Sequence, residues 1–256
     1  MPCGTHCTLL LLPPIRWANR CPRWKQVDHA KLCRMYHQMF LNLMGKSRKP
    51  TLLKGEAFDC DVFVSTSGVL NGALHYIQFE LLFFCGEWKR AAKMALQKRK
   101  GAVSGSVAFM FQTCHRGLAL YAMAHRTGKW RYKSHACQIR KTVEGWMKMG
   151  NPNVQHYHNL LCAEQAALDG KNQSAEALYK GAIQLAARAG HLNDAGLFNE
   201  RYAAFLLRSN PKSALAEDEA KYRIEQAIHF YKEWEAVAKV EMLEDNLRMG
   251  LLSLDL

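Results

Sequence analysis

The chain has 256 residues, of which 49% are hydrophobic, 22% are charged and only 7 are prolines. This composition excludes an intrinsically disordered chain, a collagen-like chain and a small disulfide scaffold, and the length predicts one or two domains with a sizeable core. The net charge of +13 is uneven, because residues 1–50 carry nine Lys and Arg against one acid, 51–150 carry fifteen against six, and 151–256 carry eleven against fifteen. The basic first part of the chain therefore suits an acidic partner.

The nine cysteines form no paired framework, and their number is odd. This pattern favours reduced thiols and a cytoplasmic location over a disulfide-bonded secreted fold. Cys3 and Cys7, with His6 between them, resemble half of a zinc site, but no second pair follows at zinc-finger spacing. We therefore expect no metal site.

Neither a signal peptide nor a membrane span is expected. The apolar segment at 8–15 has no Lys or Arg before it and contains Pro13 and Pro14, so it lacks the features of a secretory signal. The strongly apolar run at 79–85 lies between Gln78 and Glu87, and it is far shorter than the roughly 20 residues that span a bilayer.

Residues 1–26 show no helical periodicity and are expected to form an irregular leader, followed by a helical domain over 27–250 and a tail over 251–256. Apolar stripes at helical spacing predict helices in the following order: 36–44, 70–84, 88–98, 107–128, 136–146, a hairpin over 158–190 with its turn at Gly170, 194–207, 214–234 and 237–247. The basic segment KRKGAVSGS at 98–106 is expected to be a linker, although its cations and glycines would also suit a phosphate or an acidic loop.

The second half contains an internal repeat. AEALYKGAI at 175–183 and AKYRIEQAI at 220–228 share a rhythm of small and apolar residues at an offset of 45, which lies within the range of helical-hairpin repeats. No segment alternates with the period of a half-buried strand for long enough to predict a sheet. The predicted fold class is therefore all-α, as a right-handed superhelical stack of about five helical hairpins whose final helix caps the array.

No group of residues in the sequence points to catalysis. Cys114 and His115 are adjacent, so on a helix their side chains diverge by about 100°. His156 and His158 are two residues apart and do not face each other on a helix. We expect no catalytic residue, no metal ligand and no cofactor site.

A dense basic stretch is the main candidate for binding. Its candidate partner-binding residues are Arg116, Arg126, Arg131, Lys133 and Arg140, interleaved with Tyr121, Trp130 and Tyr132. Cations mixed with aromatic rings are also typical of a nucleic-acid groove, so an RNA-binding helical repeat is the alternative. RNA-reading repeats use side chains at fixed positions in every repeat, and the acidic last hundred residues show no such series. An acidic protein surface is therefore the expected partner, and nucleic acid is not.

The sequence resembles the tetratricopeptide-like helical region of large multidomain signalling ATPases, proteins that also carry a serine/threonine-kinase-like module, an AAA ATPase module, a GAF domain and a hybrid histidine kinase. The resemblance covers roughly residues 70–245 and lies in FCGEWKRAAKMA at 84–95, in the hairpin at 163–207 and in YKEWEAVAKVEML at 231–243. It implies a tetratricopeptide-like fold and a role in protein–protein contacts.

The catalytic motifs of those proteins are missing here. The sequence contains no GxxxxGK[ST] loop, no HRD or DFG string and no histidine-kinase box, so there are no positions onto which catalytic residues can be carried. The expected function is a non-enzymatic scaffold or regulatory segment in signal transduction. Its expected partner is an acidic protein surface or a kinase or ATPase module, and the chain is expected to be part of, or derived from, a larger signalling protein.

Overall fold

The computed structural model describes residues 25–97 and 107–250. The expected leader, linker and tail lie outside the described residues, except that the first helix already begins at Lys25. The described part contains ten α-helices and one short 3₁₀ helix. They are α2 (Lys25–Leu43), α3 (Gly68–Phe84), α4 (Trp88–Ala95), α5 (Val107–Thr127), α6 (Trp130–Lys148), η1 (Pro152–Val154), α7 (Gln155–Leu168), α8 (Asn172–Arg188), α9 (Leu192–Ser209), α10 (Ala214–Glu233) and α11 (Val237–Arg248).

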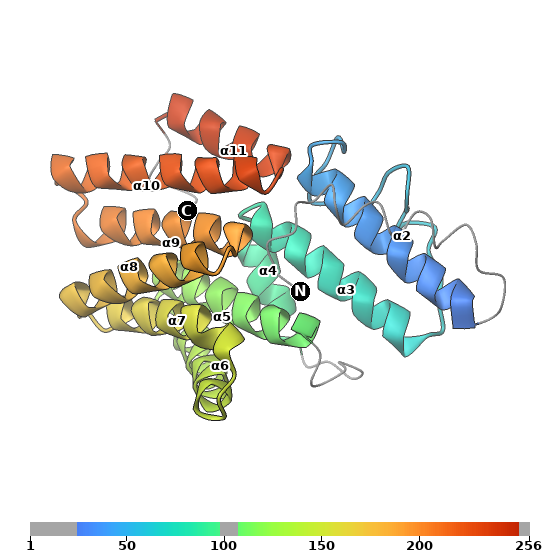
Figure 1. The fold of residues 1–256 in the computed structure, drawn as a ribbon, viewed down its shortest axis with the longest axis horizontal. Helices are drawn as coiled ribbons and strands as arrows, with labels where there is room; N and C mark the ends of the chain where they lie inside the picture. Colours follow the sequence, from blue (N-terminus) through green and yellow to red (C-terminus); the bar gives the residue numbers. More distant parts are fainter. Residues whose placement is uncertain (1–24, 98–106, 251–256) are drawn as a thin grey trace.

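The all-α prediction is confirmed for these residues, whose only β pairing is an isolated bridge between Lys54 and Asp59. Helices that follow one another in the chain pack as adjacent pairs, most extensively α5 with α6, α7 with α8, and α9 with α10. Contacts of α4 with α5 and of α8 with α9 join one pair to the next. Figure 1 shows α7 to α10 lying side by side in chain order.

Most of the described helices, α9 being an exception, stop at or next to a residue with left-handed backbone, which allows a short turn. After α7, Gly170 has a φ of 72°, and the amide of Lys171 donates a 2.9 Å hydrogen bond to the carbonyl of Ala166. This bond closes the last turn of the helix and sends the chain back along it, a conformation that glycine adopts without steric cost. The turn after α10 has the same bond, from Ala236 to Tyr231, but there the left-handed residue is Glu235, with a φ of 65°.

The two segments of the internal repeat fall on α8 and α10, the second helices of successive pairs. The matched residues are buried in both helices: Ala175, Ala182 and Ile183 in α8, and Ala220, Ala227 and Ile228 in α10. Small residues on a buried face allow helices to approach closely. At Gly196 in α9, an added Cβ would lie only 2.9 Å from the buried ring of Tyr231 in α10.

The first described helix joins the two ends of the array. Helix α2 packs on α3 and also touches α11, the helix that the sequence predicts as the cap of the array. Side chains of α2 hold the long connection to α3: Gln38 Oε1 accepts from the amide of Ala57 at 2.9 Å, and Asn42 Nδ2 donates to the carbonyls of Pro50 and Leu52.

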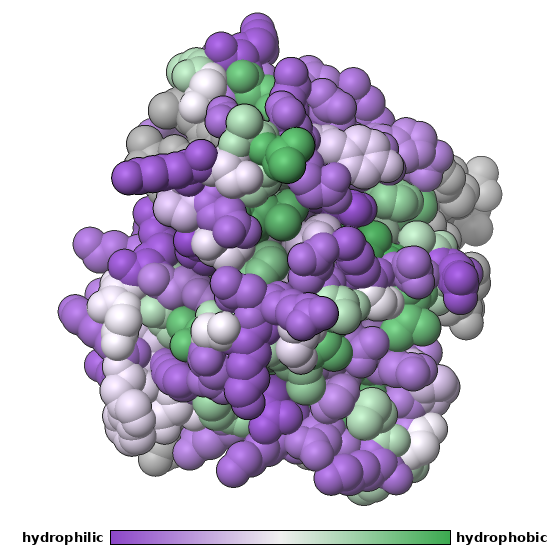
Figure 2. All heavy atoms as spheres, turned by 90° about the vertical axis from the view of Figure 1, so that its left-hand side faces the viewer, coloured by the Kyte–Doolittle hydropathy of each residue, from purple (hydrophilic) through white to green (hydrophobic). Residues whose placement is uncertain are grey.

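One face of the molecule is mainly polar (Figure 2). Figure 2 shows the face at the left of Figure 1, where hydrophilic side chains dominate and hydrophobic residues are scattered between them. None of the described helices is both long enough and apolar enough to cross a bilayer.

Candidate functional site

The predicted basic residues do not gather into one surface. Arg126 and Arg131 are exposed at the turn between α5 and α6, beside the exposed Lys129 and Trp130. We call these four residues the α5–α6 turn surface. The side chain of Trp130 is 77% exposed, and Trp130 is the only exposed tryptophan among the residues that the structure describes.

Arg116 is held elsewhere, at the end of α4. Its guanidinium donates to the carbonyl of Ala95 from Nε at 3.1 Å and from Nη2 at 2.5 Å. Burial lowers the pKa of Arg116 from its ordinary value. Because this cation satisfies a helix C-terminus, it stabilises the packing of α4 on α5 and is not presented to a partner.

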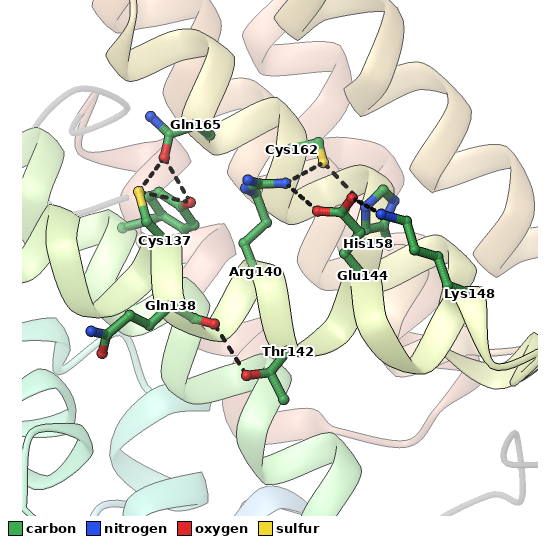
Figure 3. A network of polar contacts seen from close by, with 10 residues as sticks. Cys137, Gln138, Arg140, Thr142, Glu144, Lys148, His158, Cys162 and Gln165 are labelled. Atoms are coloured by element: carbon green, nitrogen blue, oxygen red, sulfur yellow. Dashed lines mark hydrogen bonds and ion pairs between the residues drawn. The ribbon is translucent and has the colours of Figure 1, made fainter.

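Lys133 and Arg140 fasten α6 to α7. Lys133 Nζ lies 2.8 Å from Asp169 Oδ1, and Arg140 Nη1 donates to Glu144 at 3.2 Å and to Cys162 Sγ at 3.9 Å. Figure 3 shows Arg140 pointing between these two partners. Of the five predicted residues, Arg126 and Arg131 are the two that are exposed, and both lie at the α5–α6 turn.

Sequence reasoning missed a buried chain of polar groups that crosses four helices. Glu80 Oε2 of α3 lies 2.7 Å from His115 Nδ1 of α5, and His115 Nε2 lies 2.7 Å from the hydroxyl of Tyr157 in α7. The Tyr157 hydroxyl donates to Asp194 Oδ1 of α9 at 2.6 Å. His156 Nε2 contacts the other oxygen of Asp194 at 3.0 Å, and all five side chains are buried. We call Glu80, His115, Tyr157 and Asp194 the buried polar chain.

The single proton of Tyr157 fixes the direction of these bonds. Since that proton goes to Asp194, the hydroxyl oxygen must accept from His115 Nε2, and His115 Nδ1 is left to face Glu80. Burial lowers the pKa of His115, but the charges of Glu80 and Asp194 and the hydrogen bond to Glu80 outweigh burial, so the pKa is raised overall. Both ring nitrogens of His115 are thus engaged, Nε2 with Tyr157 and Nδ1 with Glu80, and neither remains for the adjacent Cys114.

A cavity of about 120 Å³ lies against this chain. Helices α2, α3, α5 and α9 and the turn after α10 line it with Met39, Tyr76, Glu80, Phe84, Phe111, His115, Asn193, Asp194 and Trp234. We call it the inner cavity. It has four aromatic walls and two carboxylates, and none of its lining residues is a serine, threonine, cysteine or lysine.

Two further buried ion pairs stabilise the second half of the fold. Arg201 of α9 bonds Glu164 of α7 through two nitrogens, at 2.7 and 3.1 Å, and His125 Nε2 lies 3.0 Å from the same carboxylate. Burial alone would raise the pKa of Glu164, but Arg201 and His125 hold it well below its ordinary value. Glu200 of α9 accepts from Tyr231 Oη at 2.5 Å and from Lys239 Nζ of α11 at 2.7 Å.

Among the described residues, Asp59, Cys60 and Asp61 are the one group whose possible metal-ligand atoms lie close together. The ammonium of Lys54 already lies 3.4 Å from Asp59 and 2.7 Å from Asp61, where a cation would sit. The Cys3–Cys7 segment lies outside the described residues. Comparisons with protein-family models, with curated proteins and with solved structures find no match to this chain.

The buried polar chain should make the stability of the protein depend on pH. The pKa of His115 is raised above its unfolded value of about 6.5, so its stabilising contribution is complete below that pH and is lost as the pH rises through the folded pKa. Titration of one proton changes the free energy of unfolding by at most about 1.4 kcal/mol per pH unit. The groups facing the imidazole are Glu80, Tyr157 and Asp194.

Urea unfolding of the wild type and of His115→Gln at several pH values measures this effect. Glutamine keeps a polar group but cannot titrate, so the difference in stability between the two proteins should shrink as the pH rises. A difference that stays constant or grows with pH would contradict a raised pKa for His115 in the folded protein.

Proposed function

We propose that this chain is a non-enzymatic helical scaffold of signal transduction that docks an acidic segment of a protein partner on the α5–α6 turn surface. Its helices would form a tetratricopeptide-like superhelical stack of about five hairpins, an arrangement that the packing of successive helices in pairs supports. Following the sequence resemblance, the partner would be a kinase or ATPase module, in the same protein or in another one.

The observation that carries the proposal is an exposed tryptophan surrounded by exposed cations. A tryptophan is usually at least partly buried, because leaving its large ring in water forgoes a substantial hydrophobic gain. Trp130 is 77% exposed and lies between Lys129 and Arg131, with Arg126 across the turn. Tryptophan and arginine are the residues most enriched among those that dominate binding energy at protein interfaces.

The local charge favours an acidic partner. Helix α6 carries five Lys and Arg against one acid, Glu144, and its first turn has no acidic residue and no side-chain cap. The positive end of the helix dipole therefore adds to the charges of Lys129 and Arg131, and no carboxylate in the first turn neutralises it. On the neighbouring part of α6, the carboxylate of Asp169 already pairs with Lys133, so this helix binds a carboxylate within its own chain.

Fluorescence anisotropy with a labelled short peptide of glutamate and leucine tests the proposal. Trp130→Ala should weaken binding by about thirtyfold, because truncation of a central tryptophan costs about 2 kcal/mol. Arg131→Glu should weaken it more steeply at low salt than at high salt. The matched control is Lys221→Glu, the same charge change at an exposed position of α10, which should leave binding unchanged.

Two outcomes would overturn the proposal. One is a peptide affinity that Trp130→Ala does not alter. The other is tight, salt-sensitive binding of single-stranded RNA that Trp130→Ala and Arg131→Glu abolish while the acidic peptide does not bind, which would make this surface a nucleic-acid site.

A further inference from the structure

The inner cavity holds a buried acid with one unused oxygen. Glu80 is 1% exposed, and its Oε2 is bound by His115. Its Oε1 is also shielded from solvent, yet it has no hydrogen-bond partner among the described residues. Leaving a buried acceptor unpaired is costly, and more so when the group is charged, so this oxygen marks a place where a donor is expected.

The partners already present identify the kind of donor that Oε1 would take. His115 bonds only the other oxygen of Glu80, whereas Asp194 is contacted by Tyr157 on one oxygen and by His156 on the other. Oε1 of Glu80 is therefore the carboxyl oxygen of this cavity that a ligand can reach without displacing a side chain. An anion brings no donor to it, whereas an ammonium group brings both a donor and a charge that a carboxylate attracts.

The remaining walls suit an organic cation better than a hydrated metal ion. Tyr76, Phe84, Phe111 and Trp234 surround the space with aromatic rings, and Met39 adds a thioether. Aromatic faces attract ammonium groups and pack against alkyl carbons. Only two carboxylates are available, whereas calcium sites use six to eight oxygens and magnesium keeps most of its water.

The volume of the cavity limits the size of the ligand, and its position determines how the ligand enters. Its volume of about 120 Å³ is close to that of an engineered cavity of about 150 Å³ that binds benzene. Tyr76, Phe111 and Asn193 are only partly buried, so the cavity reaches the surface between α3, α5 and α9. A linear group of about five heavy atoms fits this space.

We propose that the inner cavity binds a primary alkylammonium group, which donates to Glu80 Oε1 and places its alkyl chain among Tyr76, Phe84, Phe111 and Trp234. Such a group can come from a free small amine or from a lysine side chain of a peptide. The site goes beyond the proposed docking function and shares no residue with the α5–α6 turn surface, so each can fail without affecting the other.

Nuclear magnetic resonance of the full chain with labelled methionine methyl groups tests this site. Met39 lines the cavity, and Met149 is exposed on the far end of α6 as an internal control. Titration with n-butylammonium should shift the Met39 signal in a saturable way and leave the Met149 signal in place. The neutral analogue n-butanol should bind at least about tenfold more weakly, because it brings no charge to Glu80.

Two variants locate the binding chemistry. Glu80→Gln keeps the size of the side chain and removes its charge, and it should weaken butylammonium binding by about tenfold to a hundredfold. Phe111→Leu leaves the buried polar chain intact and removes one aromatic wall, so it should weaken binding by about threefold or more. This second variant keeps the test valid if Glu80→Gln does not fold.

The source of the ammonium group is decided with a blocked Gly-Lys-Gly peptide. Binding of this peptide as tightly as butylammonium means that the cavity takes a lysine side chain, and binding of butylammonium alone means that it takes a free amine. The proposal is overturned if neither compound shifts the Met39 signal, in which case water fills the cavity. It is also overturned if butanol binds as well as butylammonium, or if a folded Glu80→Gln variant binds unchanged.

Discussion

Replacing Arg201 by methionine should lower the free energy of unfolding by about 3–5 kcal/mol, measured by urea unfolding. The guanidinium of Arg201 is fully buried, bonds Glu164 twice and lies over the ring of Trp88 at 5.2 Å. Methionine fills much of the same volume but leaves the Glu164 carboxylate buried without its main counterion. Breaking a buried ion pair from one side is strongly destabilising for this reason.

The double variant Arg201→Met with Glu164→Gln separates the charge effect from lost packing. Removing the orphaned carboxylate should restore a large part of the stability, because both charges are then gone. Lys180→Met breaks an exposed pair with Glu176 and should cost less than about 1 kcal/mol. Equal losses in Arg201→Met and in the double variant would show that packing, and not the buried charge, sets the effect.

Replacing Lys239 by methionine should also cost about 3–5 kcal/mol, through a different pair of helices. Lys239 lies on α11 and is 4% exposed, and its ammonium is the cation paired with the buried Glu200 of α9. Without it, Glu200 keeps only the hydroxyl of Tyr231. We expect α11 to lose its attachment to the rest of the fold.

Lys232→Met is the matched control for Lys239→Met. Lys232 pairs with Glu244 of α11 at 2.8 Å, so it joins α10 to the same helix, but the two side chains are 59% and 41% exposed. Its loss should change the free energy of unfolding by less than about 1 kcal/mol. If the two variants are equally stable, Lys239 does not hold α11 in place.

The helices and the order of their packing could be predicted because the signals are local. Stripes such as Leu70, Leu74 and Ile77 repeat at helical spacing, and Gly170 marks the turn of a hairpin without knowledge of any distant residue. The contact of α2 with α11 could not be predicted in this way. It joins segments near opposite ends of the described chain, and no periodicity records such a contact.

The binding candidates were predicted less well, because a cation's role depends on its partner. Arg116, Lys133 and Arg140 look like Arg126 and Arg131 in the sequence. In the structure, Arg116 is only partly exposed and bonds a helix end, Lys133 pairs with Asp169, and Arg140 contacts Glu144 and Cys162, whereas Arg126 and Arg131 are exposed at the α5–α6 turn. Only the fold brings those partners within reach.

The contacts of the buried polar chain could hardly be predicted from the sequence. His115 is separated from Glu80 by 35 residues and from Tyr157 by 42, so no motif spacing connects them. The one available signal is that Glu80 interrupts the apolar run FELLFFC, where an acid is costly unless it is paired. An acidic residue inside a strongly apolar stripe therefore indicates that a hydrogen-bonding partner lies on another helix, as His115 does for Glu80.

The closure of the array by α2 changes how the fold can come apart. In an open stack of hairpins each end frays by itself, since a terminal unit has a neighbour on one side only. Here α2 packs on α3 and also contacts α11, the last helix of the array. Unfolding of α3 or of α11 therefore exposes part of the same helix, α2, to solvent. We therefore expect the two ends to open together more often than the ends of an open stack, because each of them loses packing against the same helix.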